Sequence, residues 1–490
     1  MLLALPILIP LATAIAISMM PQRPQLLRAV AFAGAVGIFA SGVAVFARVE
    51  AEGIQVLQIG AWPAPFGITL VADLFSALLV VMVGIVGLVV TGNSFSGVDP
   101  RREAFGYHAL LHILLMGVSG AFLTGDIFNL YVWFEVMLIA SFVLMSLYRN
   151  NSQLHAAFTY VTLNLLASAI LLTAIGLLYG QAGTLNFADL ARAWPERRTP
   201  ALDATLSMLF VIAFGIKAGL FPLFFWLPAS YHTPPAAVGA LFAGLLTKVG
   251  VYALIRVFTL LFPDAGGMYT VVLVLSVTTM VVGMIGALGQ RDFRRVLSFN
   301  LVGHIGFTTL GLALWTPFAL AGSIFYMLHH IVVITNLFLV SGLFLRLRRT
   351  THLSELGGLY RTHTFVAVLA MIPLFSLAGV PPLSGFFAKL AIIEAALNIG
   401  YYWLAGIALA VSLLTLVSMA RLWEDAFWKP APPEANSTPL GTMVLAPIAV
   451  LAMLTLALAL AAEPVFSVSR RAAEQLLQPD GYVRAVLGGQ

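Results

Sequence analysis

The sequence contains no cysteine and very little charge. Without cysteine, disulfide bonds, thiolate metal sites and cysteine nucleophiles are all excluded. Only 9% of the 490 residues are charged, 25 basic and 20 acidic, whereas 61% are apolar and the mean hydropathy is +1.00. A chain of this length would ordinarily form about three soluble domains, but so few charges could not cover their surfaces. A soluble enzyme, a disordered protein and a nucleic-acid-binding protein are therefore excluded, despite a pI near 9.5.

What the sequence has instead is a series of long apolar stretches, separated by charged residues and by clusters of Pro and Gly. A helix needs about 20 apolar residues to cross a bilayer, so the chain has room for about fourteen spans. We therefore predict an all-α polytopic membrane protein. The spans are expected to begin near residues 2, 27, 69, 104, 127, 156, 204, 236, 268, 294, 316, 364, 402 and 440. The first span follows a start without basic residues, which predicts an uncleaved helix rather than a signal peptide.

Three segments between or after the spans have a character of their own. Residues 50–65 are polar, aromatic and rich in Gly and Pro, which favours a hairpin-like loop. Residues 189–203 form the longest charged loop. Residues 466–478 interleave apolar side chains with Arg470, Arg471 and Glu474, and this pattern is typical of a short helix lying on the membrane surface.

The basic residues of the loops indicate an orientation. If the N-terminus faces outward, fourteen of them lie on the cytoplasmic side, Arg149 and Arg291 included, and eight lie on the outer side. Short cytoplasmic loops of membrane proteins are enriched in Lys and Arg. We therefore predict that the N-terminus lies outside, and we interpret the net charge of +5 as loop charge rather than as a surface for a partner.

Four charged residues lie deep inside apolar spans. The chain has only four lysines, and three of them, Lys217, Lys248 and Lys389, interrupt apolar runs, as Glu135 does. A charge at the centre of a bilayer costs about 2.5–3.5 kcal/mol on insertion scales. Four such groups are therefore candidates for a functional site. The alternative is a structural ion pair between Glu135 and one lysine, which would leave two lysines without an obvious acid.

Buried lysines of this kind are suited to carrying protons. Desolvation disfavours the ammonium form of a buried lysine, and a nearby carboxylate favours it again. Moving Glu135 towards or away from Lys217 would therefore load or unload a proton. Ionisable groups inside membranes commonly mark proton relays, so the sequence predicts a relay with Glu135 as its switch.

Prolines interrupt two of the spans that carry these lysines. Pro222 follows Lys217 by five residues, and Pro381 and Pro382 precede Lys389. A proline inside a helix frees a carbonyl, and such breaks persist in membranes only where protein or a cavity surrounds them. Paired broken helices are typical of inverted-repeat transporters.

The two interrupted spans are the seventh and the twelfth, five apart, which predicts a five-helix repeat. We expect the repeats at residues 104–262 (spans four to eight) and 268–424 (spans nine to thirteen). Spans one to three at 1–92 would precede them. The last span and the surface helix at 440–490 would follow.

Histidines could complete the relay. His304 lies in span ten and His330 in span eleven, both in stretches free of charge. Histidine titrates near neutral pH and suits proton transfer, although a neutral histidine can equally hydrogen-bond across a helix interface. His108 and His112 are four apart, as in a metal pair, but no carboxylate accompanies them, so we predict no metal. We also expect no cofactor.

At this point the chain resembles a known family, the antiporter-like subunits shared by Mrp-type cation/proton antiporters and respiratory complex I. The resemblance covers nearly the whole chain. It is strongest over Gly120–Glu135, Lys217–Pro222, His232–Lys248 and Pro381–Lys389. Position 389 is a lysine, where a glutamate is the alternative, and we expect no long lateral helix at the C-terminus. With these two features the chain looks most like one particular subunit type of the Mrp antiporters.

The resemblance implies roles for individual residues. Glu135 would be the acid paired with Lys217, Lys248 the central relay lysine, and Lys389 the terminal lysine that exchanges protons with the far half-channel. His330 would match the histidine of span eleven.

The chain departs from the family's pattern at one position in span eleven. Relatives often carry a lysine four residues after the span-eleven histidine, and here the position is Ile334. His304 or bound water would have to bridge that gap.

The function implied is that of a proton-translocating subunit of a multisubunit Na+/H+ antiporter in the bacterial inner membrane. It would be a secondary transporter and not an enzyme. Its partners would be the other subunits of an Mrp complex, protons and Na+, and membrane lipids, with no nucleic acid. The alternatives are a proton-pumping subunit of a quinone- or hydrogenase-linked respiratory complex and a non-conducting scaffold subunit. A solute transporter has little support, because no polar cluster suited to a sugar or amino acid is visible.

Overall fold

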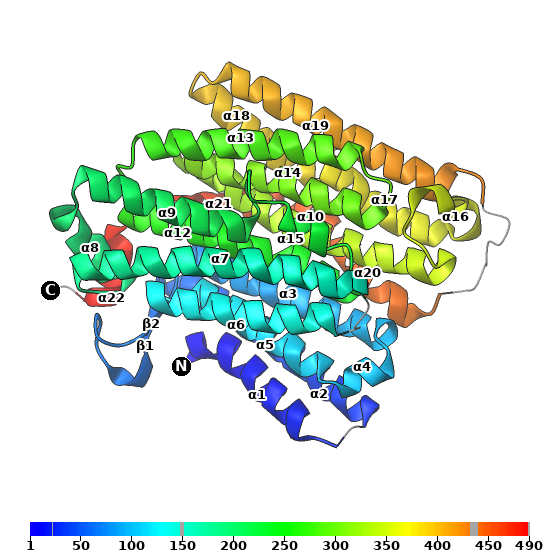
Figure 1. Ribbon diagram of the computed structural model, residues 1–490, viewed down its shortest axis with the longest axis horizontal. Helices are drawn as coiled ribbons and strands as arrows, with labels where there is room; N and C mark the ends of the chain where they lie inside the picture. The colour runs from blue at the N-terminus through cyan, green and yellow to red at the C-terminus, as the bar shows by residue number, and fades with distance from the viewer. Residues whose placement is uncertain (22, 148–150, 432–439, 489–490) are drawn as a thin grey trace.

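The computed structural model describes residues 1–21, 23–147, 151–431 and 440–488. Within these ranges twelve helices are long and apolar enough to cross a membrane. Two shorter apolar helices, α5 (Tyr107–Leu123) and α17 (Thr364–Ala378), raise the number of candidate spans to fourteen. The all-α polytopic fold is therefore confirmed, and the helices lie side by side along the length of the molecule (Figure 1). Arg149, one of the basic residues used for the orientation, lies outside the described residues.

In the predicted grouping, three N-terminal spans precede two sets of five, and this division stays a prediction. The N-terminal group is α1 (Leu5–Met19), α2 (Pro24–Glu52) and α3 (Leu74–Gly97). The next five spans are α5, α6 (Ile127–Ser146), α7 (Asn151–Ala182), α9 (Pro200–Ala218) with α10 (Trp226–Ser230), and α11 (Ala236–Leu241) continued by α12 (Thr247–Leu261). The second five are α13 (Gly267–Leu288), α14 (Phe293–Leu314), α15 (Pro317–Arg348), α17 with α18 (Ser384–Asn398), and α19 (Tyr402–Trp423). Since each group has an odd number of spans, the second group begins on the opposite side of the bundle, and the two are inverted relative to each other.

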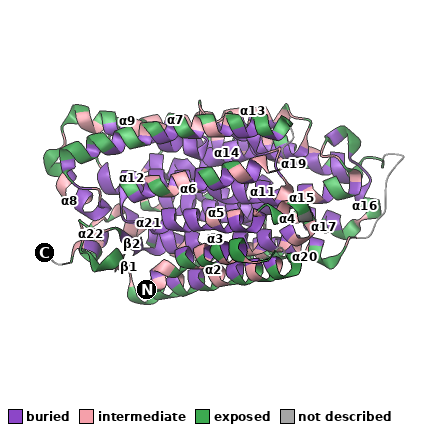
Figure 2. Ribbon diagram, turned by 60° about the horizontal axis from the view of Figure 1, so that its bottom comes forward, coloured by how far each residue is buried: buried purple, intermediate pink, exposed green. Residues whose placement is uncertain are grey.

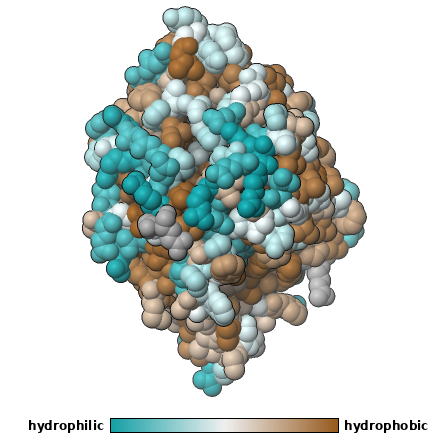
Figure 3. Space-filling model, turned by 90° about the vertical axis from the view of Figure 1, so that its left-hand side faces the viewer, coloured by the Kyte–Doolittle hydropathy of each residue, from teal (hydrophilic) through white to brown (hydrophobic). Residues whose placement is uncertain are grey.

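Short elements connect the spans at the two ends of the bundle. They are β1 (Gln55–Gln58), β2 (Thr69–Ala72), α4 (Pro100–Ala104), α8 (Phe187–Arg197) and α16 (Leu359–Thr362). The hairpin, α8 and the C-terminus lie at one end, and α4 and α16 lie at the other (Figure 1). Hydrophilic side chains gather on the end that carries α8, with hydrophobic surface beside them (Figure 3).

Two of the predicted loops are more ordered than expected. The hairpin-like loop predicted at residues 50–65 is displaced along the chain: α2 runs to Glu52, and the hairpin consists of β1 and the later β2, which pair antiparallel from Gln55–Ala72 to Gln58–Thr69. The predicted charged loop at 189–203 is wrong in part, because α8 covers most of it. Asn186 caps this helix, its side chain accepting hydrogen bonds from the backbone N–H groups of Ala188 and Asp189.

The chain ends with α20 (Thr442–Leu460), α21 (Ala462–Leu477) and α22 (Asp480–Leu487). Helix α21 is the surface helix predicted from residue 466, and it begins four residues earlier. Its apolar face packs on protein, because the ring of Phe466 meets Phe318 and Phe325 of α15 at centroid distances of 5.4 and 6.1 Å. Its placement relative to a bilayer stays a prediction.

Burial separates the spans into an inner and an outer set (Figure 2). The most deeply buried spans are α11–α12, α14 and α15, whereas in α1, α2 and α20 fewer than half of the residues are buried. Large apolar side chains on the outer helices point outward, including Ile139, Phe158 and Leu413. Such faces are suited to contact with lipid. The three inner spans are those that carry Lys248, His304 and His330.

Candidate functional site

The two broken spans end in the same way. Helix α9 stops at Ala218 and α17 at Ala378, and in each case the next residue is a glycine, Gly219 with φ +90° and Gly379 with φ +87°. Only glycine adopts this left-handed conformation readily. In the segments that follow, the peptide bonds Phe221–Pro222 and Pro381–Pro382 are cis.

Neighbouring helices satisfy the backbone at the first break. The amide of Phe221 donates to the Thr279 hydroxyl at 2.9 Å, and the Trp226 indole donates to the Ile216 carbonyl at 2.9 Å. Irregular backbone at membrane depth requires such partners. The prediction that the prolines mark helix breaks agrees with this geometry.

Glu135 and Lys217 are connected through a third residue. The Ser168 hydroxyl on α7 donates to a Glu135 carboxylate oxygen on α6, and the Lys217 ammonium donates to the Ser168 hydroxyl oxygen at 3.0 Å. The pair predicted from sequence is therefore bridged rather than in direct contact. The ammonium also lies 4.6 Å from the centre of the Phe134 ring, a cation–π distance. Lys217 is buried, whereas Glu135 is partly exposed.

Lys248 lies just after a local widening of its helix. Residues Phe242–Leu246 form a π-helical turn between α11 and α12, and the Lys248 ammonium donates to the Ala243 carbonyl at 2.6 Å. π-Helical turns are frequent at functional sites. Gly250, two residues on, lies so close to α9 that a Cβ there would be 2.6 Å from the amide of Ala218. This close approach brings the helix of Lys248 against the break that follows Lys217.

Lys389 bonds to the second break. Its ammonium donates to the carbonyl of Ala378, the last residue of α17, at 2.8 Å. The carbonyl freed where the helix ends is thus the acceptor for the lysine on the following half-helix, α18. The ammonium also lies 5.8 Å from the centre of the Phe307 ring on α14.

Two histidines lie near both of the last two lysines. The rings of His304 and His330 stack at a centroid distance of 5.0 Å, and both lie within electrostatic range of Lys248 and of Lys389. His304 contacts the Tyr326 hydroxyl through Nδ1 at 2.5 Å. The histidines therefore occupy the region in which Ile334, itself buried, supplies no ionisable group.

Several buried polar atoms beside these histidines have no hydrogen-bond partner among the described residues. They are both ring nitrogens of His330, Nε2 of His304, the hydroxyls of Thr247 and Thr335, and the amide of Asn336. Buried polar groups are nearly always satisfied by protein or by ordered water. This part of the interior is thus chemically suited to water that connects the histidines with the lysines.

A second buried charge pair lies near the end of the bundle that carries the hairpin. Arg256 on α12 and Asp73, the residue that caps α3, are 2.6 Å apart, and both side chains are about 4% exposed. The guanidinium also packs over the rings of Tyr252 and Tyr482. This pair has both its charges matched, in contrast to the lysines.

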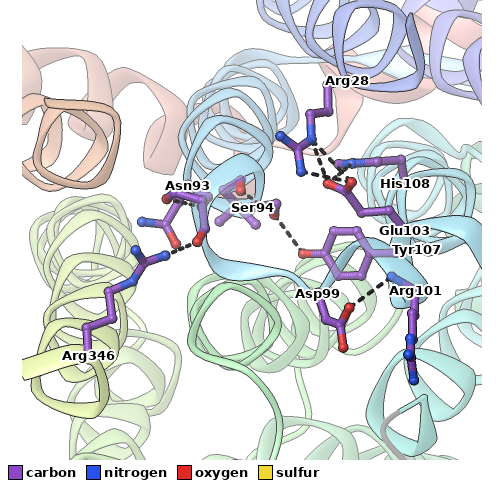
Figure 4. Close-up of polar contacts among 11 residues, drawn as sticks. Arg28, Asn93, Ser94, Asp99, Arg101, Glu103, Tyr107, His108 and Arg346 are labelled. Atoms are coloured by element: carbon purple, nitrogen blue, oxygen red, sulfur yellow. Dashed lines mark hydrogen bonds and ion pairs between the residues drawn. The ribbon is translucent and has the colours of Figure 1, made fainter. Parts of the chain in front are cut away.

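A carboxylate from outside the span lies next to His108 of α5. Glu103 of α4 is 3.3 Å from His108 and 2.9 Å from Arg28 (Figure 4). Burial opposes ionisation of Glu103, but its hydrogen bonds with His108 and Arg28 outweigh it and hold the pKa of this carboxyl below its usual value. The expectation that no carboxylate accompanies the pair is therefore wrong.

This carboxylate does not make the pair a metal site. The Nδ1 atom of His112 contacts the His108 carbonyl of its own helix rather than Glu103. In the part of the chain that is described, no group of three His, Cys, Asp or Glu could hold a metal.

Comparison with known proteins identifies the class to which this arrangement belongs. Residues 124–415 match the family described as NADH:quinone oxidoreductase/Mrp antiporter, transmembrane region. The chain is 44% identical over 490 residues to a protein of Alkalihalophilus pseudofirmus, with 99% of each chain covered. It is 40% identical over 488 residues to a protein of Bacillus subtilis, covering 99% of this chain and 98% of the other. A chain in the structure of the Mrp complex from a Dietzia species superposes with a TM-score of 0.93 at 33% identity, covering 99% of each.

The chain therefore belongs to the family of NADH:quinone oxidoreductase and Mrp antiporter membrane subunits, a family of transporters in which the resemblance seen in the sequence had placed it. Both of these relatives are named as the D subunit of an Na+/H+ antiporter. Lysine at position 389 indicates the same subunit type within the family, and the similarity confirms this prediction.

Proposed function

We propose that the protein is the proton-translocating subunit of a multisubunit Na+/H+ antiporter, in which protons move along Glu135, Lys217, Lys248 and Lys389 and sodium leaves in exchange. The observation that carries the proposal is the state of the three buried lysines. Among the described residues none of them forms a direct ion pair with a carboxylate, and two bond only to backbone carbonyls. Ammonium groups held so weakly can release a proton at modest cost, since desolvation already disfavours their charge.

The first step of the relay is switched by Glu135. The bridge through Ser168 transmits the carboxylate's charge to Lys217 while leaving room for a change in their separation. Protons then pass from Lys217 to Lys248 where α12 crosses the break. His330 and His304, with water on their unpartnered nitrogens, connect Lys248 to Lys389 and take over the role of the lysine that Ile334 replaces.

A purely structural role for the buried charges has less support. In a scaffold, buried charges are expected to be paired, as Asp73 and Arg256 are. The respiratory alternative is also less favoured, because both of the relatives compared above are named as antiporter subunits. In the proposed setting the partners are the other subunits of an Mrp complex and the lipids of the bacterial inner membrane. The N-terminus, the hairpin and α8 would face outward, and the arginine-rich end with α4 and α16 would face the cytoplasm.

Replacing Glu135 or Lys217 by alanine is expected to abolish proton-coupled sodium efflux while the complex still assembles. Glu135→Ala removes the switch and Lys217→Ala removes the first proton carrier. The complex should still assemble, because the buried Lys217 can become neutral when the carboxylate is gone and Glu135 is partly exposed to solvent. Exchange is measured with a pH-sensitive dye in vesicles that contain the complex. Normal exchange by either variant would sink the proposal.

Ser168→Ala is expected to slow the exchange about tenfold without abolishing it, because a charge-assisted hydrogen bond is lost but both charges stay. Ser168→Thr keeps a hydroxyl at the same place and should restore most of the rate. The same dye assay measures both variants. If Ser168→Ala and Ser168→Thr both exchange at the rate of the unchanged protein, the bridge has no part in transport.

A further inference from the structure

A pocket lies at the end of the bundle that carries α4 and α16, beside the first turn of α14. Its volume is about 320 Å³, and its walls come from α3, the segment Thr233–Ala237, α14, α15 and the start of α20. Two arginines line it, Arg294 of α14 and Arg346 of α15. Its remaining lining includes apolar side chains such as Leu343 and Val444.

Arg294 is a buried cation that forms no ion pair among the described residues, although the carboxylate of Asp292, two residues earlier, acts on it at longer range. It is 5% exposed, and its guanidinium donates to the Ser341 hydroxyl at 2.8 Å and to the Pro234 carbonyl at 3.0 Å. Its second terminal nitrogen, Nη2, has no partner among the described residues. No carboxylate in that part of the chain lies within ion-pair distance of it, whereas the equally buried Arg256 has Asp73 at 2.6 Å.

A guanidinium cannot relieve burial by losing its proton. An unmatched buried charge is costly, and an anion that reaches Nη2 would remove most of that cost. The planar group offers its free N–H bonds in a geometry that fits the oxygens of a phosphate. The Arg294 guanidinium, held in place by Ser341 and Pro234, is therefore one half of a phosphate-binding site.

Arg346 provides a second cation at the mouth of the pocket. It is exposed, and it extends from α15 toward Asn93 on α3, where its guanidinium donates to the Ser96 carbonyl (Figure 4). No ion pair to Arg346 occurs within the described residues. One arginine thus closes the inner side of the pocket and the other stands at its opening.

The position and the lining of the pocket determine the kind of anion. Both arginines lie within one or two turns of a span's end, the depth at which lipid headgroups sit. Three leucines of α15 and Val444 of α20 line the pocket beside the arginines, and of these Leu345 is exposed. Basic pockets between spans on the cytoplasmic side are typical sites for anionic headgroups. An apolar wall suits an acyl chain and offers nothing to a free inorganic anion.

We propose that this pocket binds an anionic phospholipid, with its phosphate between Arg294 and Arg346 and an acyl chain along α15 and α20. The site is separate from the lysine relay; it rests on the membrane orientation proposed above and not on proton transport.

Native mass spectrometry of the purified, delipidated complex tests the proposal. The complex is titrated with phosphatidylglycerol, with zwitterionic phosphatidylcholine and with inorganic phosphate. Phosphatidylglycerol should be retained in preference to phosphatidylcholine. Loss of one charge-assisted contact in Arg294→Gln or Arg346→Gln should weaken that retention about tenfold. Arg361→Gln, which removes an exposed arginine at the same end that does not line the pocket, should leave it unchanged.

Three results would overturn the proposal. The first is equal retention of the two lipids. The second is binding of inorganic phosphate that displaces phosphatidylglycerol, which would assign the site to a free anion. The third is unchanged retention in Arg346→Gln, which would be the outcome if a side chain of another subunit filled the pocket. Because Arg346 is exposed, Arg346→Gln is expected to assemble. It therefore tests the proposal even if Arg294→Gln fails to assemble.

Discussion

Lys248→Met is expected to reduce sodium-coupled proton exchange at least about a hundredfold, the scale of a lost proton-transfer group, while the complex assembles as well as before or better. Methionine has nearly the volume of lysine and fills the same space. It removes a buried ammonium whose only hydrogen-bond partner among the described residues is the Ala243 carbonyl, and replacing a buried charge by an apolar group is often neutral or stabilising. Exchange activity should therefore fall, while the stability of the complex stays the same or rises.

Lys429→Met is the matched control for this experiment. Lys429 is the one lysine outside the spans, is exposed, and pairs with Asp425 four residues earlier. Its loss should leave both exchange and assembly nearly unchanged, because Lys429 itself is exposed and the buried Asp425 keeps Arg421 as a partner at 3.7 Å. Exchange is followed by dye in vesicles and assembly by size-exclusion chromatography of the detergent-solubilised complex. If Lys248→Met exchanges normally, the relay is wrong and a scaffold role for the buried charges gains support.

Breaking the pair between Asp73 and Arg256 is expected to have the largest effect on stability. Asp73→Asn or Arg256→Met alone should lower the free energy of unfolding by about 3–5 kcal/mol, because each leaves one uncompensated buried charge. Asparagine is still a good N-cap residue, so Asp73→Asn removes the charge and keeps the cap of α3. Thermal and denaturant unfolding of the purified protein in detergent measures the change.

The double variant distinguishes a charge effect from a packing effect. Asp73→Asn combined with Arg256→Met leaves no buried charge and should recover most of the lost stability, since buried pairs are often replaceable. Arg48→Met, which breaks the exposed pair with Glu52, should cost less than about 1 kcal/mol. Additive losses in the double variant would refute the interpretation that the two charges depend on each other.

Much of the candidate site could be predicted from the sequence because its members are exceptional within their spans. A lysine in an apolar run stands out regardless of the fold, and so do Pro222 and Pro381. The bridge through Ser168 could not be found in this way. A serine inside an apolar helix is common, and it normally bonds to a carbonyl of its own helix, as Ser141 does.

The partners of Glu103 and Asp73 could not be predicted from the sequence either. Each lies at the end of a helix, where a charged residue is expected to meet water. Their contacts, Arg28 and Arg256, are remote in the chain and come close only when the helices pack. Helix α8 was missed because its sequence is charged, and its apolar side, with Phe187, Leu190 and Trp194, is too short to stand out.

Three features follow from the amino-acid sequence without a structure: that the protein spans a membrane many times, which spans carry charged residues and where two helices break. They follow from the cost of placing charge and unpaired backbone in hydrocarbon, a cost that depends on local composition alone. Which buried charges have partners depends instead on how the helices pack. That packing matches Arg256 with Asp73, places a hydroxyl between Glu135 and Lys217, and leaves Arg294 beside a pocket without a carboxylate. Electrostatic energy depends on distances between helices, and packing sets those distances.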